Sequence, residues 1–180
     1  LKRALRLDLG RDDEAYLIRS RAFLAADDYS NASQDCEASI RSNGSHPQSF
    51  ALLARIHQAQ SSPENAISAL TQAIDLENDH LKKSDFLKQR AQLFRSLQKP
   101  QSALEDLEHS VSLNPSNPTS WLQIAEIHQA GSDWKSVNDA LQNSLSVRIP
   151  PPRKLTQTAK AIAEKSCQFF DDKILNESEL

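Results

Sequence analysis

The chain has 180 residues, of which 38% are hydrophobic and 6% aromatic, and its formal net charge is −3. A domain that binds a nucleic-acid duplex normally carries a clustered basic excess, so this charge balance argues against nucleic acid as a partner. No apolar run approaches the roughly 18 residues that are needed to span a bilayer, so no membrane partner is indicated.

Only 3 of the residues are glycine and 2 are cysteine. So few glycines, together with many Ala, Leu, Gln, Ser and Glu residues, predict an all-α protein. Two cysteines make no disulfide framework, and the cytoplasm is therefore the expected compartment. The chain has no methionine and opens inside a helical pattern, which predicts an excerpt of a longer polypeptide.

A period of 34 residues organises the chain. Residues 1–12 look like the tail of a preceding repeat. Four repeats then cover residues 13–46, 47–80, 84–117 and 118–151, with an insertion at 81–83 between the second and the third. The insertion is expected either to reshape a binding groove or merely to lengthen a loop, since a short insertion costs little.

The same residue types recur at fixed positions of the repeat. Position four is large and apolar, position eight is small, and position twenty is Ala or Val. These columns are Tyr16, Phe50, Leu87 and Trp121; Ser20, Ala54, Ala91 and Ala125; and Ala32, Ala66, Ala103 and Val137. Large and small residues at helical spacing are what two closely packed helices require.

The turn inside each repeat carries signals for the start of a second helix. Asp28, Ser62 and Asp133 are expected to cap that helix, and Pro63 and Pro100 suit its first turn. Each repeat is therefore predicted to be a pair of helices.

With this period and these columns, residues 13–151 resemble the tetratricopeptide repeat (TPR) family. The resemblance implies a right-handed α-solenoid of antiparallel helix pairs whose first helices line a concave groove. His57 and His128 depart from the pattern, because they replace the usual aromatic residue at position eleven. Residues 152–175 are amphipathic and are expected to form a C-terminal capping helix, or alternatively an anchor helix for a partner; residues 176–180 are expected to be a frayed tail.

The sequence carries no catalytic or metal-binding motif. His57 and His128 lie two repeats apart, too far to share one zinc ion. Cys36 falls in a core column, Cys167 has no evident activating neighbour, and three glycines could hardly build a phosphate-binding loop. We expect a protein that is not an enzyme and needs no cofactor or metal.

The resemblance assigns six positions of each first helix to the groove. Arg21 and Arg55 share one column, and the apolar residues flank a basic stripe. The predicted peptide-binding residues are Arg21, Arg55, Lys88, Arg95, Leu17, Leu24, Leu52 and Gln92. Because guanidinium groups make bidentate contacts with carboxylates, these residues favour an acidic peptide with apolar anchors. The alternative is that the charges are simply solvated or paired with neighbouring repeats.

Chaperone-binding members of the family hold a C-terminal carboxylate with Lys, Asn and Arg residues at set positions. In the frame that starts at the first repeat, those positions hold Leu17, Arg21, Leu52, Asp85 and Gln89. The frame that starts at the second repeat does not match either. Binding to chaperone tails is therefore not supported.

The leading interpretation is a protein–protein interaction scaffold or adaptor within a larger protein or assembly. The alternative is a targeting or regulatory arm of an enzyme whose catalytic domain lies outside this sequence. RNA binding is a third possibility, disfavoured by the acidic balance and the lack of a basic-aromatic face. The sequence leaves the oligomeric state and the partner open.

Overall fold

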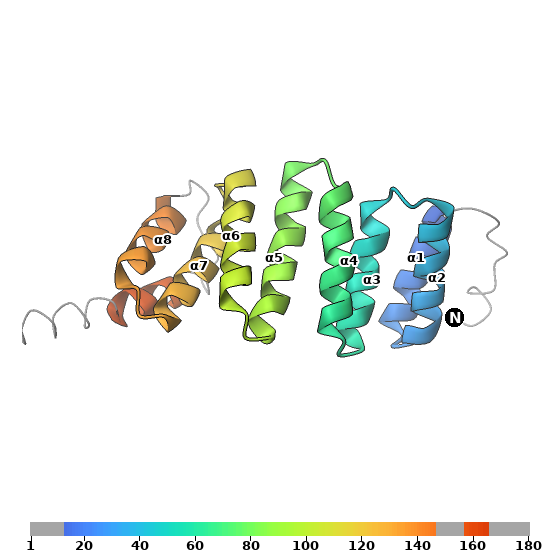
Figure 1. Ribbon diagram of the computed structural model, residues 1–180, viewed down its shortest axis with the longest axis horizontal. Helices are drawn as coiled ribbons and strands as arrows, with labels where there is room; N and C mark the ends of the chain where they lie inside the picture. Colours follow the sequence, from blue (N-terminus) through green and yellow to red (C-terminus); the bar gives the residue numbers. More distant parts are fainter. Residues whose placement is uncertain (1–12, 147–156, 166–180) are drawn as a thin grey trace, which may run out of the picture. The chain divides into compact units, whose positions relative to one another are not determined.

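The computed structural model describes residues 13–146 and 157–165, and all regular structure within these ranges is helical (Figure 1). The helices are α1 (Asp13–Ala25), α2 (Tyr29–Ser42), α3 (Pro47–Ala59), α4 (Pro63–Leu76), α5 (His80–Ser96), α6 (Pro100–Leu113), α7 (Pro118–Ala130) and α8 (Trp134–Ser146). A further helix covers residues 157–165. The absence of strands from the described ranges agrees with the all-α prediction.

The predicted repeat tail 1–12, the ends of the predicted capping helix, the tail 176–180 and Cys167 lie outside the described residues. Within the described helix 157–165, Ala159 and Ile162 are buried. Ile162 also lines a shallow pocket together with Glu126 and Gln129 of α7. This part of the predicted helix therefore packs beside α7.

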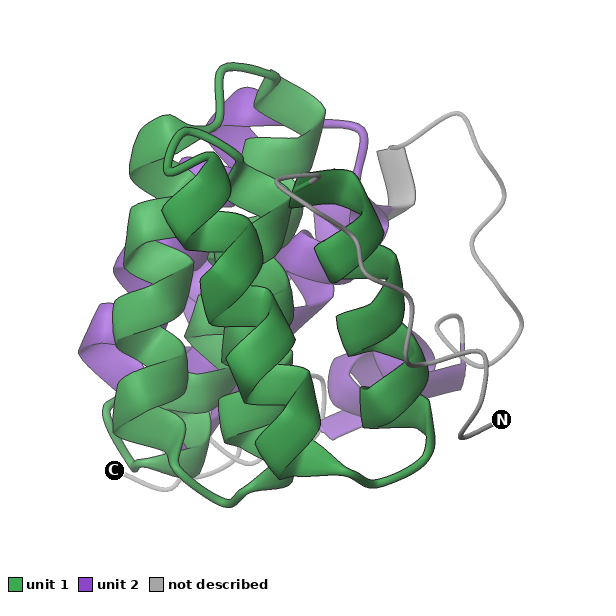
Figure 2. Ribbon diagram, turned by 90° about the vertical axis from the view of Figure 1, so that its right-hand side faces the viewer, with its two compact units in different colours: residues 1–99 green, residues 100–180 purple. Residues whose placement is uncertain are grey.

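The chain divides into two compact units, Leu1–Lys99 and Pro100–Leu180 (Figure 2). In the first unit, each helix from α1 to α5 packs against the next, and α1 also contacts α3 directly. In the second unit, α6 packs against α7 and α7 against α8. The contact between α1 and α3 places these two first helices in the same layer of the first unit.

The recurring small residues lie where helices meet. Ser20, Ala54, Ala91 and Ala125 are at most 2% exposed, and the position-twenty residues Ala32, Ala66, Ala103 and Val137 are all 0% exposed. A small side chain at a crossing lets two helices approach closely enough for the large residues beside it to interdigitate. Positions eight and twenty of the repeat are therefore core positions.

Two pairs of buried serines join helices of successive repeats. Ser39 of α2 and Ser49 of α3 have their Oγ atoms 2.9 Å apart, and Ser110 of α6 and Ser120 of α7 have theirs 3.2 Å apart. All four residues are 0% exposed, and within each pair one hydroxyl donates a hydrogen bond to the other where water does not reach. No motif in the sequence predicted these pairs, although both have the same spacing of ten residues.

The insertion does not lengthen a loop. Residues 81–83 belong to α5, which has 17 residues where α3 and α7 each have 13. The Asp79 side chain caps the longer helix by accepting hydrogen bonds from the backbone N–H groups of Leu81 and Lys82. Adding the residues to a helix satisfies their backbone groups, which a loop would leave to water.

Two of the three predicted helix caps form. Asp28 accepts a hydrogen bond from the backbone nitrogen of Asn31, and Asp133 accepts one from that of Ser136, each at 3.3 Å. Ser62 is the residue before α4, but its side chain makes no capping hydrogen bond. That part of the prediction is wrong.

The turns inside the repeats are closed by residues with positive φ. Asp27, Ser61, Gln98 and Ser132 have φ between 55° and 59°, and all occupy position fifteen of their repeat. In the second repeat, the Ser61 and Ser62 backbone N–H groups donate to the carbonyls of Gln58 and His57 at 3.0 and 2.9 Å. This is the hydrogen-bond pattern of a Schellman motif, in which glycine is the usual left-handed residue.

Replacing Ser61 with glycine is expected to raise the free energy of unfolding by about 0.5–1 kcal/mol. A side chain in the left-handed region costs about 1–2 kcal/mol, whereas the extra chain entropy of glycine costs about 0.5–1 kcal/mol. The measurement is urea unfolding followed by circular dichroism. Ser68→Gly, at an exposed position inside α4, is the control and should lower the stability by about 0.5 kcal/mol. If both variants lost stability equally, the left-handed turn would not be strained.

Candidate peptide-binding face

Two arginines project from neighbouring helices of the first unit. Arg21 of α1 and Arg55 of α3 occupy position nine of successive repeats, and both are exposed. Neither side chain makes a hydrogen bond or ion pair with any residue that the structure describes. Ile18, about one turn before Arg21 on α1, is 60% exposed. We call Ile18, Arg21 and Arg55 the α1–α3 face.

The structure corrects the assignment of two predicted groove residues. Leu17 and Leu52 are each 3% exposed, and they form a core cluster with Ala32, Cys36 and Ile56. They hold α1, α2 and α3 together and leave almost no surface for a ligand. The physical reason is that α1 and α3 contact each other, so the positions between them turn inward.

Leu24, also predicted for the groove, is only partly buried against this cluster. It lies on α1 one turn after Arg21. Its remaining exposed surface can still meet a ligand, so Leu24 replaces Leu17 and Leu52 as an apolar neighbour of the basic residues.

The remaining predicted residues lie on α5, which packs against α4. Gln92 and Arg95 are exposed, whereas the Lys88 side chain is 21% exposed and its Nζ lies 2.7 Å from Oδ1 of Asp85. Because Asp85 offsets the charge of Lys88, the basic stripe is weaker at α5 than the sequence predicts. Arg21 and Arg55 are therefore stronger candidates for binding an anionic ligand than Lys88.

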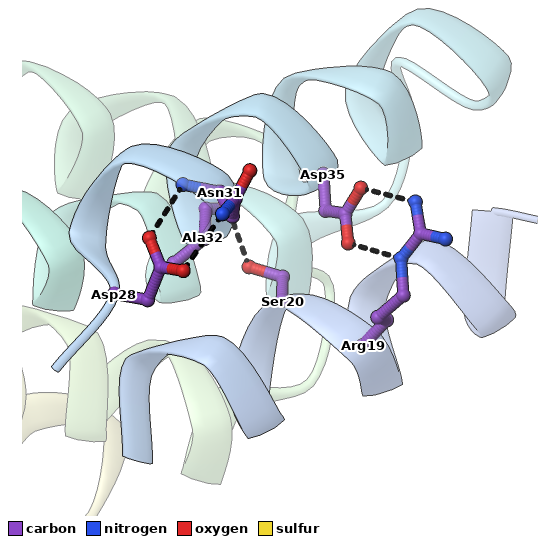
Figure 3. Close-up of polar contacts among 6 residues, drawn as sticks. All are labelled: Arg19, Ser20, Asp28, Asn31, Ala32 and Asp35. Carbon is purple, nitrogen blue, oxygen red and sulfur yellow. Dashed lines mark hydrogen bonds and ion pairs between the residues drawn. The ribbon is translucent and has the colours of Figure 1, made fainter. Parts of the chain in front are cut away.

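A partly buried ion pair, absent from the sequence predictions, joins α1 to α2 (Figure 3). Arg19 of α1 donates from Nε and Nη2 to the two carboxylate oxygens of Asp35 of α2, at 2.5 and 2.6 Å. The Asp35 side chain is 7% exposed. These hydrogen bonds raise the pKa of the Arg19 guanidinium, which also lies 5.6 Å from the centre of the Tyr16 ring.

The second repeat has apolar residues at the positions of this ion pair. Leu53 and Ala69 occupy the repeat positions of Arg19 and Asp35. Together with His57 and neighbouring residues of α4, they line a shallow pocket of about 300 Å³. His57 thus lies at the interface between α3 and α4.

Cys36 is a core residue, as the sequence predicts. It is 0% exposed and its thiol donates to the carbonyl oxygen of Ser49 at 3.0 Å. Burial raises the pKa of the Cys36 thiol to about 12, so the nucleophilic thiolate is scarce at neutral pH.

Residues 13–146 and 157–165 bring no three His, Cys, Asp or Glu side chains together in a way that could hold a metal ion. In the same ranges, no helix combines the length and the hydrophobicity needed to cross a bilayer. The side chains that stand out chemically in these ranges are the exposed arginines and the buried ion pair.

A family model described as "ChAPs (Chs5p-Arf1p-binding proteins)" matches residues 17–164. Comparison with curated protein sequences gave no significant match. Among solved structures, a tetratricopeptide repeat protein from Parabacteroides merdae aligns with a TM-score of 0.74 and 21% identity over 90% of this chain and 62% of that chain. MamA from Desulfovibrio magneticus aligns with a TM-score of 0.68 and 14% identity over 95% and 98% of the two chains. The Arabidopsis OM64 TPR domain aligns with a TM-score of 0.58 and 18% identity over 66% and 95%.

At these identities the solved structures show the fold alone, and they confirm the expected class: an all-α solenoid of antiparallel helix pairs of the tetratricopeptide type. This fold is generally that of a protein-interaction scaffold. The family model covers both units and most of the described helices. The chain therefore belongs to the ChAPs family, the Chs5p-Arf1p-binding proteins.

Proposed function

We propose that this chain is a non-catalytic scaffold that holds an acidic segment of a partner protein on the α1–α3 face. The observation that supports this most strongly is the repetition of an exposed arginine at position nine of α1 and α3, two helices that contact each other. A guanidinium group presents a planar fork of donors that matches a carboxylate, so two of them in register favour an extended acidic segment.

The exposed Ile18 gives the same face an apolar contact. It is 60% exposed, and it shares α1 with Arg21. Binding surfaces commonly combine an apolar anchor with charges that set orientation and register. The ligand expected here is therefore a segment with two or more carboxylates beside an apolar side chain.

The family description names the partners to test first. Its members are described as binding Chs5p and Arf1p, so we propose that one of these two proteins supplies the acidic segment. We further propose that the protein acts in the cytoplasm, in keeping with the expectation from its two cysteines.

Arg21→Ala/Arg55→Ala is expected to weaken binding to Chs5p or Arf1p about tenfold at low salt, because each arginine loses a charge-assisted hydrogen bond. The measurement is a fluorescence titration of the 180-residue chain with each purified partner at two salt concentrations. The effect should shrink at the higher salt, since screening weakens exposed charge pairs.

Arg41→Ala is the matched control, because Arg41 is an exposed arginine on α2 whose Nη1 lies 3.6 Å from Glu37. It removes the same charge from another face and should leave the affinity unchanged. If the unaltered chain binds a partner and the double variant binds it equally well, the α1–α3 face is not the site. If the unaltered chain binds neither protein, the choice of partner is wrong.

A further inference from the structure

We propose that Asn43 is a site of spontaneous deamidation, and that its conversion to aspartate loosens the contact between the start of α1 and the end of α2. This inference does not depend on the proposed binding function. It concerns the exposed connection from α2 to α3, where Asn43 is the residue that follows α2 and Gly44 comes next.

The side chain of Asn43 is folded over the residues that follow it. Its Oδ1 accepts a hydrogen bond from the Ser45 backbone nitrogen at 3.2 Å. Its Nδ2 donates to Oδ2 of Asp13, the first residue of α1, at 2.8 Å. Gly44 has no side chain to shield its own backbone nitrogen, and both residues are exposed, so water reaches the reacting groups.

The reaction needs only water. The Gly44 backbone nitrogen loses its proton to solvent and attacks Cγ of Asn43, forming a new C–N bond. The bond from Cγ to Nδ2 breaks, and Nδ2 takes up a proton and leaves as ammonia. Water then opens the resulting succinimide ring at either carbonyl and yields aspartate or isoaspartate. The Ser45 N–H already bonded to Oδ1 stabilises the negative charge that develops on that oxygen.

The product changes the contact with Asp13. In the unmodified chain, the Asn43 amide donates to the Asp13 carboxylate and links α2 to α1 across 30 residues of sequence. Aspartate at position 43 has no N–H to donate and places a second negative charge against the first. Like charges at this separation repel, and the repulsion weakens as salt is added. The start of α1 therefore loses a hydrogen bond to the end of α2 and gains a repulsive negative charge beside Asp13.

The first test measures the rate by incubating the 180-residue chain at mildly alkaline pH and mapping its peptides by mass spectrometry. Asn78 is the internal reference, since it is exposed in the connection between α4 and α5 and is followed by Asp79. We expect Asn43 to deamidate roughly tenfold faster than Asn78, because only Asn43 precedes a glycine.

Gly44→Ala is the matched variant for the rate, and the structure tolerates it. A Cβ at Gly44 would lie 3.6 Å from the Ile40 carbonyl oxygen, an ordinary contact distance. The variant should slow the reaction at Asn43 roughly tenfold, because a side chain hinders the attacking nitrogen. Equal rates at Asn43 and Asn78, or an unchanged rate in Gly44→Ala, would overturn the assignment of the site.

The second test measures the consequence as the urea midpoint of unfolding at low salt. Asn43→Asp should lower the midpoint, and Asp13→Asn in the same chain should restore it, because the amide introduced on α1 can then donate to the new carboxylate. Asp13→Asn alone completes the double-mutant cycle. A midpoint of Asn43→Asp equal to that of the unaltered chain would show that the charge change leaves the α1–α2 contact intact, against the proposal.

Discussion

Replacing Ile56 with alanine is expected to lower the free energy of unfolding by about 3 kcal/mol. Ile56 of α3 is 0% exposed and packs in the cluster that contains Leu17 of α1 and Cys36 of α2. Removing a buried isoleucine side chain loses its transfer free energy and leaves a cavity, which together cost about 2–5 kcal/mol. The cavity falls between the first two repeats, which this cluster joins.

The measurement is urea unfolding monitored by circular dichroism, with Ile18→Ala as the control. Ile18 is the same residue type but is 60% exposed, so its replacement should change the stability by less than about 0.5 kcal/mol. Repeat proteins gain stability from contacts between neighbouring repeats. A weakened contact should therefore also broaden the unfolding transition. Equal losses in the two variants would show that the cluster does not join the repeats.

Replacing Arg19 with leucine is expected to lower the free energy of unfolding by about 2 kcal/mol. The change leaves the Asp35 carboxylate buried without its bidentate partner (Figure 3). Removing one member of a buried ion pair typically costs about 3–5 kcal/mol, because the remaining charge is uncompensated. The loss expected here is smaller than that range, because the Arg19 side chain is 21% exposed and water can partly replace it.

The double variant Arg19→Leu/Asp35→Ala tests this explanation in the same urea experiment. It copies the pair Leu53 and Ala69 that the second repeat carries at these positions. Most of the lost stability should return, because replacing both charges by apolar residues is often close to neutral. Recovery should be incomplete, since Leu53 and Ala69 line a pocket of about 300 Å³. If the double variant were no more stable than Arg19→Leu alone, the cost would come from packing and not from an unpaired charge.

Part of the candidate site could be predicted from the sequence. Arg21 and Arg55 recur at one position of a 34-residue frame, and both are exposed as a groove column should be. Leu17 and Leu52 are each 3% exposed although the same frame places them in the groove, because helical position alone does not say how far a neighbouring helix covers a side chain. The sequence also places Lys88 in the basic stripe, although an acidic partner, Asp85, lies on the same helix.

Some contacts had a sequence signal that could have been used. The third repeat has the same two residue types, as Arg90 and Asp106, at the positions that Arg19 and Asp35 occupy in the first repeat. Because a lone buried charge is costly, this recurrence favours an ion pair between Arg19 and Asp35 in the first repeat.

The sequence by itself determined the pairs of helices. Two local signals predict these helices: the alternation of small and large residues, and Asp28, Pro63 and Pro100 at the helix starts. Both act over a few residues, so they can be recognised without knowledge of the fold. The tertiary structure decided how deeply each side chain of a shared repeat position is covered. Tyr16 and Leu87 share position four, yet Tyr16 is half-buried and Leu87 is 1% exposed. Burial depends on which helices lie beside a residue, and those neighbours come from elsewhere in the chain.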